Sequence, residues 1–187
     1  STALVAGYSQ RTCKGCGKTE QKKLAKLAPT GSLNMTSIPL KVKQKTTALK
    51  VSGLASGDYI KVYTSSNKKI FTVTKKGKIT AVKAGKAVLT VKLASGKQLK
   101  AKVKVQKGTV KTSKVTVAER SKVLKKGNKI KALISPLTSQ EKVTYSTSNK
   151  KVATVSKTGK VVAKKKGKVV ITVKSGKKNA KVKITVK

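Results

Sequence analysis

The chain has 187 residues and carries 47 Lys and Arg against 4 Asp and Glu, which gives a formal net charge of +43. It contains no histidine, so a Ser-His triad, a Cys-His dyad and a histidine general base are excluded. No apolar run approaches the roughly 20 residues that a membrane-spanning helix needs.

The basic residues are almost all lysine, with arginine only at Arg11 and Arg120. Arginine binds phosphate and carboxylate groups through two parallel hydrogen bonds, whereas lysine acts as a hydrated point charge. A lysine surface therefore favours diffuse attraction to polyanions and repulsion between copies of the chain. High charge with few aromatic residues is also typical of disorder, but the ordered periodicity of the apolar residues favours a folded protein.

Residues 1–30 contain both cysteines, Cys13 and Cys16, in the order Cys-Lys-Gly-Cys-Gly. This spacing is that of half a zinc ribbon, in which two such knuckles supply four ligands. Because the chain has no histidine and no further cysteine, a local disulfide or two free thiols are favoured over a metal site, and no cofactor is expected. A thioredoxin-like site would need a βαβ context, which the pattern does not offer.

The segment Tyr8–Glu20 resembles the end of a short cysteine-knuckle repeat found in surface proteins of gut Firmicutes. That repeat carries a further upstream cysteine, which is absent here, so the segment resembles a degenerate copy. The Pro29–Gly31 stretch has the composition of a linker, and we expect the next domain to begin at residue 31.

The rest of the chain contains an internal duplication. Residues 63–92 read YTSSNKKIFTVTKKGKITAVKAGKAVLTVK, and residues 145–174 read YSTSNKKVATVSKTGKVVAKKKGKVVITVK. The two segments share 18 identities in 30 aligned positions at a constant offset, since 145 − 63 and 174 − 92 both equal 82. A repeat of about 80 residues suits a whole small domain rather than a solenoid unit. We therefore predict one domain over residues 31–107 and a second over residues 108–187.

Apolar and polar residues alternate within each copy. Leu89, Val91 and Leu93 alternate with Thr90 and Lys92. Alternation of this kind predicts strands with one face in a core and the other in water. The other alternating segments are residues 101–106 and 181–186. Asn and Gly turn signals separate the runs, which is typical of a β-sandwich or barrel.

Residues 148–161, SNKKVATVSKTGKV, followed by Gly167 and the terminal strand, resemble the bacterial immunoglobulin-like group 2 family. The first copy matches the same pattern through Ser66-Asn67 and Gly77-Lys78-Ile79. The resemblance covers roughly residues 31–187. It implies an all-β fold of two tandem immunoglobulin-like β-sandwich domains behind the small N-terminal cysteine-containing segment.

The copies depart from the family pattern at apolar positions. Phe71 stands where Ala153 gives the family's usual alanine, and Tyr63 and Tyr145 replace a common tryptophan. We expect both tyrosines to lie in the cores. No cysteine falls within either predicted domain, so each core should form from Val, Ile and Leu without a disulfide.

The four acidic residues are scattered and do not form a catalytic pair. They are Glu20, Asp58, Glu119 and Glu141. A two-carboxylate glycosidase needs both acids beside one bond, whereas Asp58 and Glu141 precede corresponding strands in different copies. We therefore predict no catalytic residues and no enzyme, and we expect lysines to neutralise each acid.

Two groups of lysines are candidate polyanion-binding residues. They are Lys100, Lys102 and Lys104 in the first copy and Lys164, Lys165, Lys166 and Lys168 in the second. The first group projects from one face of a predicted strand and the second flanks a turn. The alternative is a solvated surface whose lysines only prevent edge-to-edge pairing of strands.

The family resemblance implies a non-catalytic cell-surface or secreted module that serves as a stalk, adhesion or accessory domain. The lysine groups support an alternative function, the binding of anionic polymers such as teichoic acid, sulfated or sialylated glycans, or nucleic acid without sequence preference. Its partners would be polyanions of the bacterial cell wall or of a host surface. Because the chain opens at Ser1 without Met or a signal peptide, we expect a monomeric fragment of a larger extracellular protein.

Overall fold

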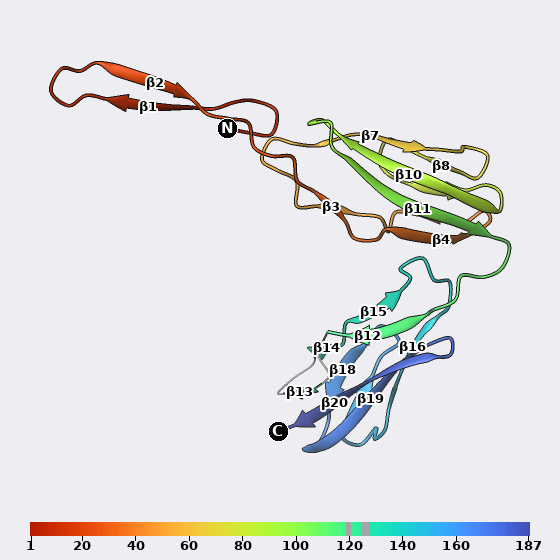
Figure 1. The fold of residues 1–187 in the computed structure, drawn as a ribbon. Helices are drawn as coiled ribbons and strands as arrows, with labels where there is room; N and C mark the ends of the chain where they lie inside the picture. The colour runs from red at the N-terminus through yellow and green to blue at the C-terminus, as the bar shows by residue number, and fades with distance from the viewer. Residues whose placement is uncertain (119–120, 125–127) are drawn as a thin grey trace. The chain divides into compact units, whose positions relative to one another are not determined.

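The computed structural model describes residues 1–118, 121–124 and 128–187, and all its regular elements in these ranges are β-strands (Figure 1). The chain divides into two compact units, Ser1–Lys107 (unit 1) and Gly108–Lys187 (unit 2). Glu119 and Arg120 lie outside the described residues. The all-β prediction is confirmed.

Unit 1 consists of an exposed hairpin and a sandwich. The hairpin is formed by antiparallel β1 (Tyr8–Thr12) and β2 (Thr19–Lys23). The sandwich strands are β3 (Ser32–Leu33), β4 (Ser37–Lys41), β5 (Lys45–Thr46), β6 (Val51–Ser52), β7 (Ile60–Ser65), β8 (Phe71–Val73), β9 (Ile79–Ala81), β10 (Gly85–Leu93) and β11 (Gln98–Gln106). They form a four-stranded sheet in the order β4-β11-β10-β7, a three-stranded sheet β5-β9-β8 and the pair β3-β6.

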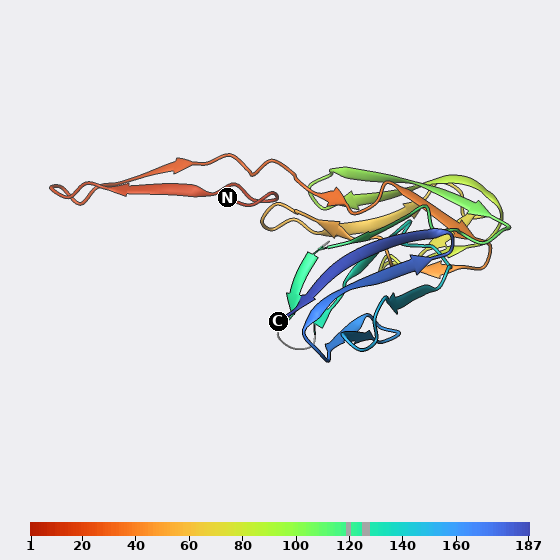
Figure 2. The same ribbon diagram turned by 90° about the horizontal axis from the view of Figure 1, so that it is seen from below.

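Unit 2 has the same set of sheets. Its strands are β12 (Lys114–Val117), β13 (Ser121–Leu124), β14 (Asn128–Lys129), β15 (Ala132–Ser135), β16 (Val143–Thr147), β17 (Ala153–Val155), β18 (Lys160–Ala163), β19 (Gly167–Ser175) and β20 (Lys178–Val186). They form the four-stranded sheet β13-β20-β19-β16, the three-stranded sheet β14-β18-β17 and the pair β12-β15. The long β19–β20 hairpin runs the length of this unit (Figure 2).

The predicted alternation builds both cores. In β10, Leu89, Val91 and Leu93 are fully buried, whereas Lys92 is exposed. The opposing three-stranded sheet contributes Phe71, the largest fully buried side chain of this core. Since burying such a side chain contributes about 1.5–3 kcal/mol, the hydrophobic effect orients the four-stranded sheet with its lysines outward.

Unit 2 follows the same rule. Val182, Ile184 and Val186 are buried in β20 while Lys181 and Lys183 are exposed. The position that corresponds to Phe71 is occupied by Ala153, which is also fully buried. This position is therefore a core position in both units.

The first strand of each four-stranded sheet pairs in parallel with the last strand of the same unit. Ser37–Lys41 lies beside Lys102–Gln106, and Ser121–Leu124 lies beside Lys183–Val186. The remaining pairs of each four-stranded sheet are antiparallel. Residues near the start of each sandwich are thus hydrogen-bonded directly to residues at its end.

The tyrosines predicted to lie in the cores are half-buried and pack against the core edges. Each ring covers a glycine: a Cβ atom at Gly77 would lie 3.0 Å from Tyr63, and one at Gly159 would lie 3.0 Å from Tyr145. These glycines have φ values of +75° and +81°. Positive φ and the close ring both favour glycine, since other residues carry a Cβ atom.

The two copies depart from one another at a hairpin turn. Gly85 pairs with Val105 in unit 1, and Gly167 pairs with Val186 in unit 2. The offset is 167 − 85 = 82 before the turn but 186 − 105 = 81 after it. The β19–β20 turn is therefore one residue shorter than the β10–β11 turn, and the constant offset of the sequence holds only up to this point.

Gly77→Ala should destabilise unit 1 more than Gly53→Ala does. Both glycines have positive φ, +75° and +67°, but a Cβ atom at Gly53 meets no heavy atom within 4 Å. We expect the left-handed backbone alone to cost about 1–2 kcal/mol in each variant, and the contact with Tyr63 to add about 1 kcal/mol or more at Gly77. Urea unfolding followed through NMR signals of unit 1 measures the difference, and equal losses would contradict the role of the ring.

Candidate functional site

The first predicted lysine group lies on the outer face of the four-stranded sheet of unit 1. Lys100, Lys102 and Lys104 are exposed on β11, and they alternate with the buried Ala101 and Val103. Residues two apart on a strand are separated by about 6.6 Å. The structure therefore places these three ammonium groups in a row, as the alternation predicted, and their binding role stays a prediction.

A fourth lysine, which the sequence analysis missed, completes this array. Lys86 on β10 is the direct cross-strand partner of Lys104, which sets their Cα atoms about 5 Å apart. Like charges placed directly opposite destabilise a sheet. We call Lys86, Lys100, Lys102 and Lys104 the lysine array.

An open depression lies beside the lysine array. Its polar lining consists of Ser37, Ser66, Lys86, Lys102 and Lys104. The backbone N–H of Val88 donates to Ser66 Oγ at 2.9 Å. A hydroxyl that accepts one hydrogen bond still has its own proton to donate, so the depression presents hydroxyl and ammonium donors together. Such a set of donors suits an anionic oxygen.

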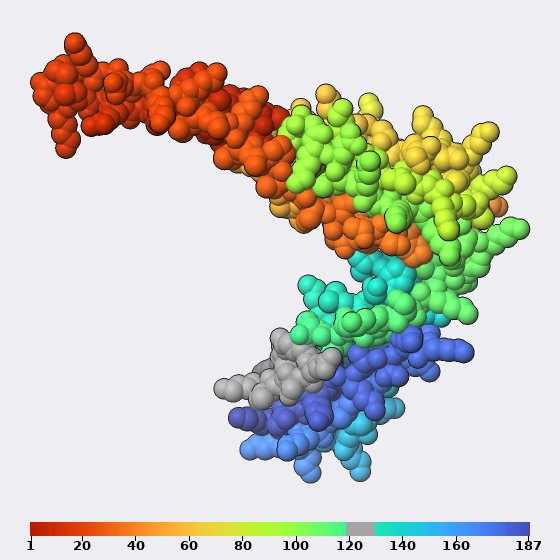
Figure 3. All heavy atoms as spheres, in the orientation of Figure 1, coloured from red at the N-terminus to blue at the C-terminus, as the bar shows by residue number. Residues whose placement is uncertain are grey.

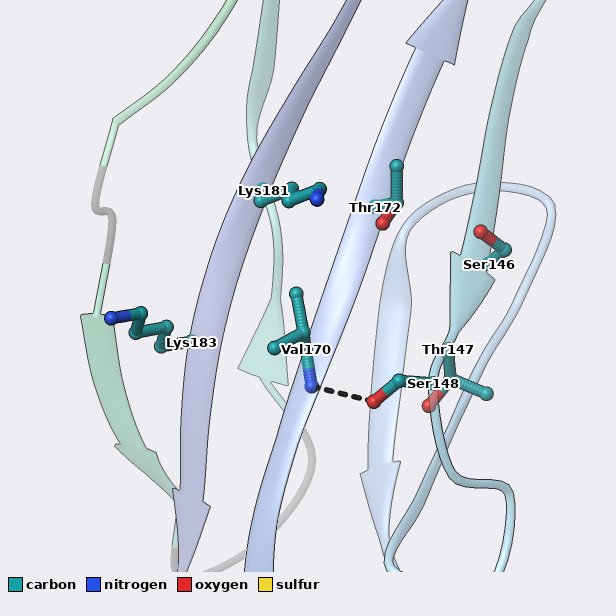
Figure 4. Close-up of a pocket in the computed structure, with 7 residues that line it drawn as sticks. All are labelled: Ser146, Thr147, Ser148, Val170, Thr172, Lys181 and Lys183. Atoms are coloured by element: carbon teal, nitrogen blue, oxygen red, sulfur yellow. Dashed lines mark hydrogen bonds between the residues drawn. The ribbon is translucent and has the colours of Figure 1, made fainter.

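Unit 2 repeats the depression with fewer cations. Figure 4 shows Ser148 accepting the N–H of Val170, at 3.0 Å, with Lys181 extending toward Thr172 and Lys183 pointing away from it. Lys183 lies opposite Val170, as Lys102 lies opposite Val88 in unit 1. The other lining residues are Ser146 and Thr147.

The unit 2 depression lacks a lysine pair like that of unit 1. The residue opposite Lys168 is Thr185, whereas Lys86 of unit 1 faces another lysine. The β19–β20 ladder therefore contains no counterpart of the Lys86–Lys104 pair, and the array of unit 1 is the stronger candidate for an anion.

The second predicted lysine group does not join the unit 2 depression. Lys164, Lys165 and Lys166 are exposed in the turn between β18 and β19, and Lys168 is exposed on β19. The backbone N–H groups of Lys164 and Lys165 both donate to the carbonyl of Val152, at 2.9 and 3.3 Å. The turn is thus held by its backbone while its side chains point into solvent.

Exposed side chains are spread over both units. Slender side chains project separately from the surface of each unit in the space-filling view (Figure 3). With 47 Lys and Arg against 4 Asp and Glu in the chain, the lysine array is one group of cations among many.

Cys13 and Cys16 are free thiols, and both are exposed in the turn between β1 and β2. A hydrogen bond from the Cys16 thiol, assisted by the backbone N–H groups of Cys16 and Gly15, lowers the pKa of Cys13. Within the described residues, no group of three or more His, Cys, Asp or Glu side chains comes together. The two thiols thus provide a pair of potential metal ligands, and metal binding by Cys13 and Cys16 stays a prediction.

Asp58 holds a turn through hydrogen bonds, and its neutralisation by lysines stays a prediction. The Ser95 hydroxyl donates to Asp58 Oδ2 at 2.6 Å, and the N–H groups of Ser95 and Tyr59 donate to Oδ1 at 3.1 and 2.9 Å. Ser95 lies in the β10–β11 turn. Asp58 therefore ties the loop before β7 to the hairpin that carries the lysine array.

Glu141 has the corresponding place in unit 2. Its carboxylate accepts the N–H of Thr112 at 2.6 Å and lies against Gly176 in the β19–β20 turn. The Ser175 hydroxyl, which is buried, donates to the Glu141 carbonyl at 3.3 Å. Both acids thus lie at the corresponding hairpin turn of their own unit, but Asp58 accepts the N–H of turn residue Ser95, whereas the Glu141 carboxylate accepts the N–H of Thr112.

Acid should weaken unit 1 through Asp58. The hydrogen bond from the Ser95 hydroxyl is the main cause that lowers the pKa of Asp58 below its ordinary 3.8. A group with a lowered folded pKa stabilises the fold fully above its unfolded pKa, and the stabilisation is lost as the pH falls through the folded value. We expect the urea midpoint of unit 1 to fall between neutral pH and about pH 2.

The matched variants isolate this carboxylate. Asp58→Asn should lower the urea midpoint at neutral pH and remove most of its dependence on acid, whereas Glu20→Gln in the exposed hairpin should leave both unchanged. If Asp58→Asn retained the full acid response of the wild type, Asp58 would not be its source.

The described residues form no helix that could cross a membrane.

No curated protein sequence matches the chain significantly. Among solved structures, the chain is similar to domains 1–6 of the surface layer protein SbsC, with 18% identity and a TM-score of 0.39 over 96% of this chain and 31% of that one. It is also similar to SbsC domains 4 and 5, with 19% identity and a TM-score of 0.38 over 84% and 97%.

A protocadherin gamma C5 fragment, EC1-3, gives 11% identity and a TM-score of 0.36 over 97% of this chain and 76% of that one. The chain spans about a third of the first of these structures. The family model of the bacterial Ig-like domain (group 2) matches residues 109–186, so the sandwich of unit 2 corresponds to a domain of this type.

Proposed function

We propose that the chain is a non-catalytic structural and adhesion module of a bacterial surface or secreted protein, in which both units are group 2 domains. The family match of residues 109–186 supports this assignment for unit 2. For unit 1, support comes from equivalent sheets and from contacts that recur at the offset of 82. Tyr63 over Gly77 is repeated by Tyr145 over Gly159.

The observation that carries the stalk function is a parallel strand pair in each four-stranded sheet. In each pair, the strand of that sheet that comes first in the sequence lies beside the strand that comes last. A force applied to the two ends of a unit pulls β4 and β11, or β13 and β20, in opposite directions along their length. The hydrogen bonds of a parallel pair are evenly spaced along the strands. They therefore share the load and must break together, which is the arrangement that a load-bearing spacer requires.

The direction of pulling should decide how strongly unit 2 resists. In single-molecule stretching of the full chain from its two ends, we expect separate unfolding events, each releasing one unit. Forced unfolding reports the unfolding rate, and shearing several bonds at once should make it slow. With handles at Gly167 and Lys187 instead, the open end of the β19–β20 hairpin is pulled apart, its bonds break one after another, and the force should be several-fold lower.

The two geometries use the same sheet and differ only in direction, so each controls for the stability of the other. Equal forces in both geometries would contradict the load-bearing function. A single low-force event that releases both units together would contradict their mechanical independence.

A second candidate function, the binding of anionic polymers, is favoured by the lysine array. Lys86 and Lys104 face each other across the hairpin despite their repulsion, and Ser66 lies in the same depression. A polymer of phosphate, sulfate or carboxylate groups would neutralise this pair and release its own counterions. The outer face of unit 1 would then attach the stalk to cell-wall or host-surface polyanions.

The triple variant Lys86→Gln/Lys102→Gln/Lys104→Gln tests this candidate. Binding of the full chain to immobilised teichoic acid, heparin and duplex DNA is measured over a range of salt concentrations. If the array holds the polymer, the variant should weaken binding and reduce the salt slope by about one for each lost contact.

The control variant is Lys75→Gln/Lys76→Gln/Lys78→Gln, which removes the same charge from the exposed turn between β8 and β9. It should retain most of the affinity. Equal weakening by both triple variants would mean that attraction is spread over the whole surface, and the array would not be a binding site.

A further inference from the structure

The tip of the N-terminal hairpin holds its two thiols in one closed turn. Thr12 and Thr19 form the last pair of the β1–β2 ladder. Beyond it, the Cys13 N–H donates to the Lys18 carbonyl at 2.8 Å, and the Gly17 N–H donates to the Cys13 carbonyl at 2.9 Å. Gly17 has a φ of +69°, which lets the chain reverse there. The backbone thus keeps Cys13 and Cys16 on the same short turn.

The surroundings of Cys13 favour a thiolate. The Cys16 thiol and two backbone N–H groups donate toward its sulfur and lower the pKa of Cys13. An open depression at the tip contains Cys13 together with the cations Arg11, Lys14 and Lys18 and the single acid Glu20, which is paired across the strands with Arg11. Positive neighbours stabilise a thiolate, and the thiolate is the nucleophile in thiol chemistry.

We propose that Cys13 and Cys16 form a thiol–disulfide exchange site that accepts anionic disulfides from outside the protein. In the first step, the Cys13 thiolate attacks one sulfur of the external disulfide, forms a mixed disulfide and releases one thiolate. In the second step, the Cys16 thiolate attacks Cys13 Sγ, forms the Cys13–Cys16 disulfide and releases the second thiolate. The external disulfide is reduced by two electrons, and the two cysteines are oxidised by the same two.

The positions of the two thiols support these roles. Both are exposed, so a disulfide borne on a small molecule or on another protein can reach them. Cys16 lies on the same closed turn as Cys13, and its thiol lowers the pKa of Cys13, so it is placed to act as the resolving thiol. The cations of the depression set the preference for an anionic disulfide, because they attract its charge. The site is independent of the stalk function and of the lysine array.

The full chain, first reduced and freed of reductant, is mixed with a limiting amount of a dianionic aromatic disulfide (Ellman's reagent). The wild type should release about two aromatic thiolates per disulfide, and its mass should fall by two hydrogens with no adduct. Cys16→Ser should release one thiolate and retain a stable aromatic adduct on Cys13. Cys13→Ser should react several-fold more slowly than Cys16→Ser.

The preference for charge is tested with Arg11→Gln/Lys14→Gln/Lys18→Gln. This variant should slow the reaction with the anionic disulfide several-fold more than the reaction with a neutral dipyridyl disulfide, because loss of the cations lowers the thiolate fraction for both reagents but removes the charge attraction only for the anionic one. The neutral reagent also reports that both thiols are present. A wild type that instead carried separate adducts on both cysteines, at the rate of a simple free thiol, would overturn the proposal. Equal rates for Cys13→Ser and Cys16→Ser would overturn the assignment of Cys13 as the attacking thiol.

Discussion

The structure depends on the burial of alternate side chains along four long strands. β10, β11, β19 and β20 each send small branched residues into a core that contains one phenylalanine in unit 1 and none in unit 2. Because only 3% of the residues are aromatic, the cores have few large side chains that could fill the space left by a strand residue that faces water. Every side chain that a strand sends inward therefore requires its neighbour to face water, and in this chain that neighbour is often lysine.

This constraint explains how the protein tolerates so much positive charge. Lysines on the outer faces keep their ammonium groups hydrated, so the charge is not buried. The cost appears as repulsion within the surface, for example where the hairpin register sets Lys86 against Lys104. The lysines also disfavour edge-to-edge strand pairing with another copy of the chain. A surface of this kind separates copies of the chain and attracts polyanions, and these two effects are compatible in a stalk.

Two of the scarce acidic residues, Asp58 and Glu141, hold turn regions of the sandwiches. Asp58 and Glu141 accept hydrogen bonds near the turns of the two long hairpins, each within its own unit. The hairpin tip differs from both sandwiches because Cys13 and Cys16 contribute to no core. A change in the oxidation state of these two thiols therefore alters neither core, and it leaves the parallel strand pairs that would carry load unaffected.

The sequence by itself determined the all-β class, the buried positions of β10, β11 and β20, and the correspondence of Tyr63 with Tyr145, because period-two alternation and a duplicated segment are local properties. It also placed Lys100, Lys102 and Lys104 on one face. Only the tertiary structure decided that Lys86 faces Lys104, that Asp58 accepts from Ser95, and that the second hairpin turn is one residue shorter. The physical reason is register: a shift of one residue changes every cross-strand partner, and the turn and its distant hydrogen-bond partners set that register.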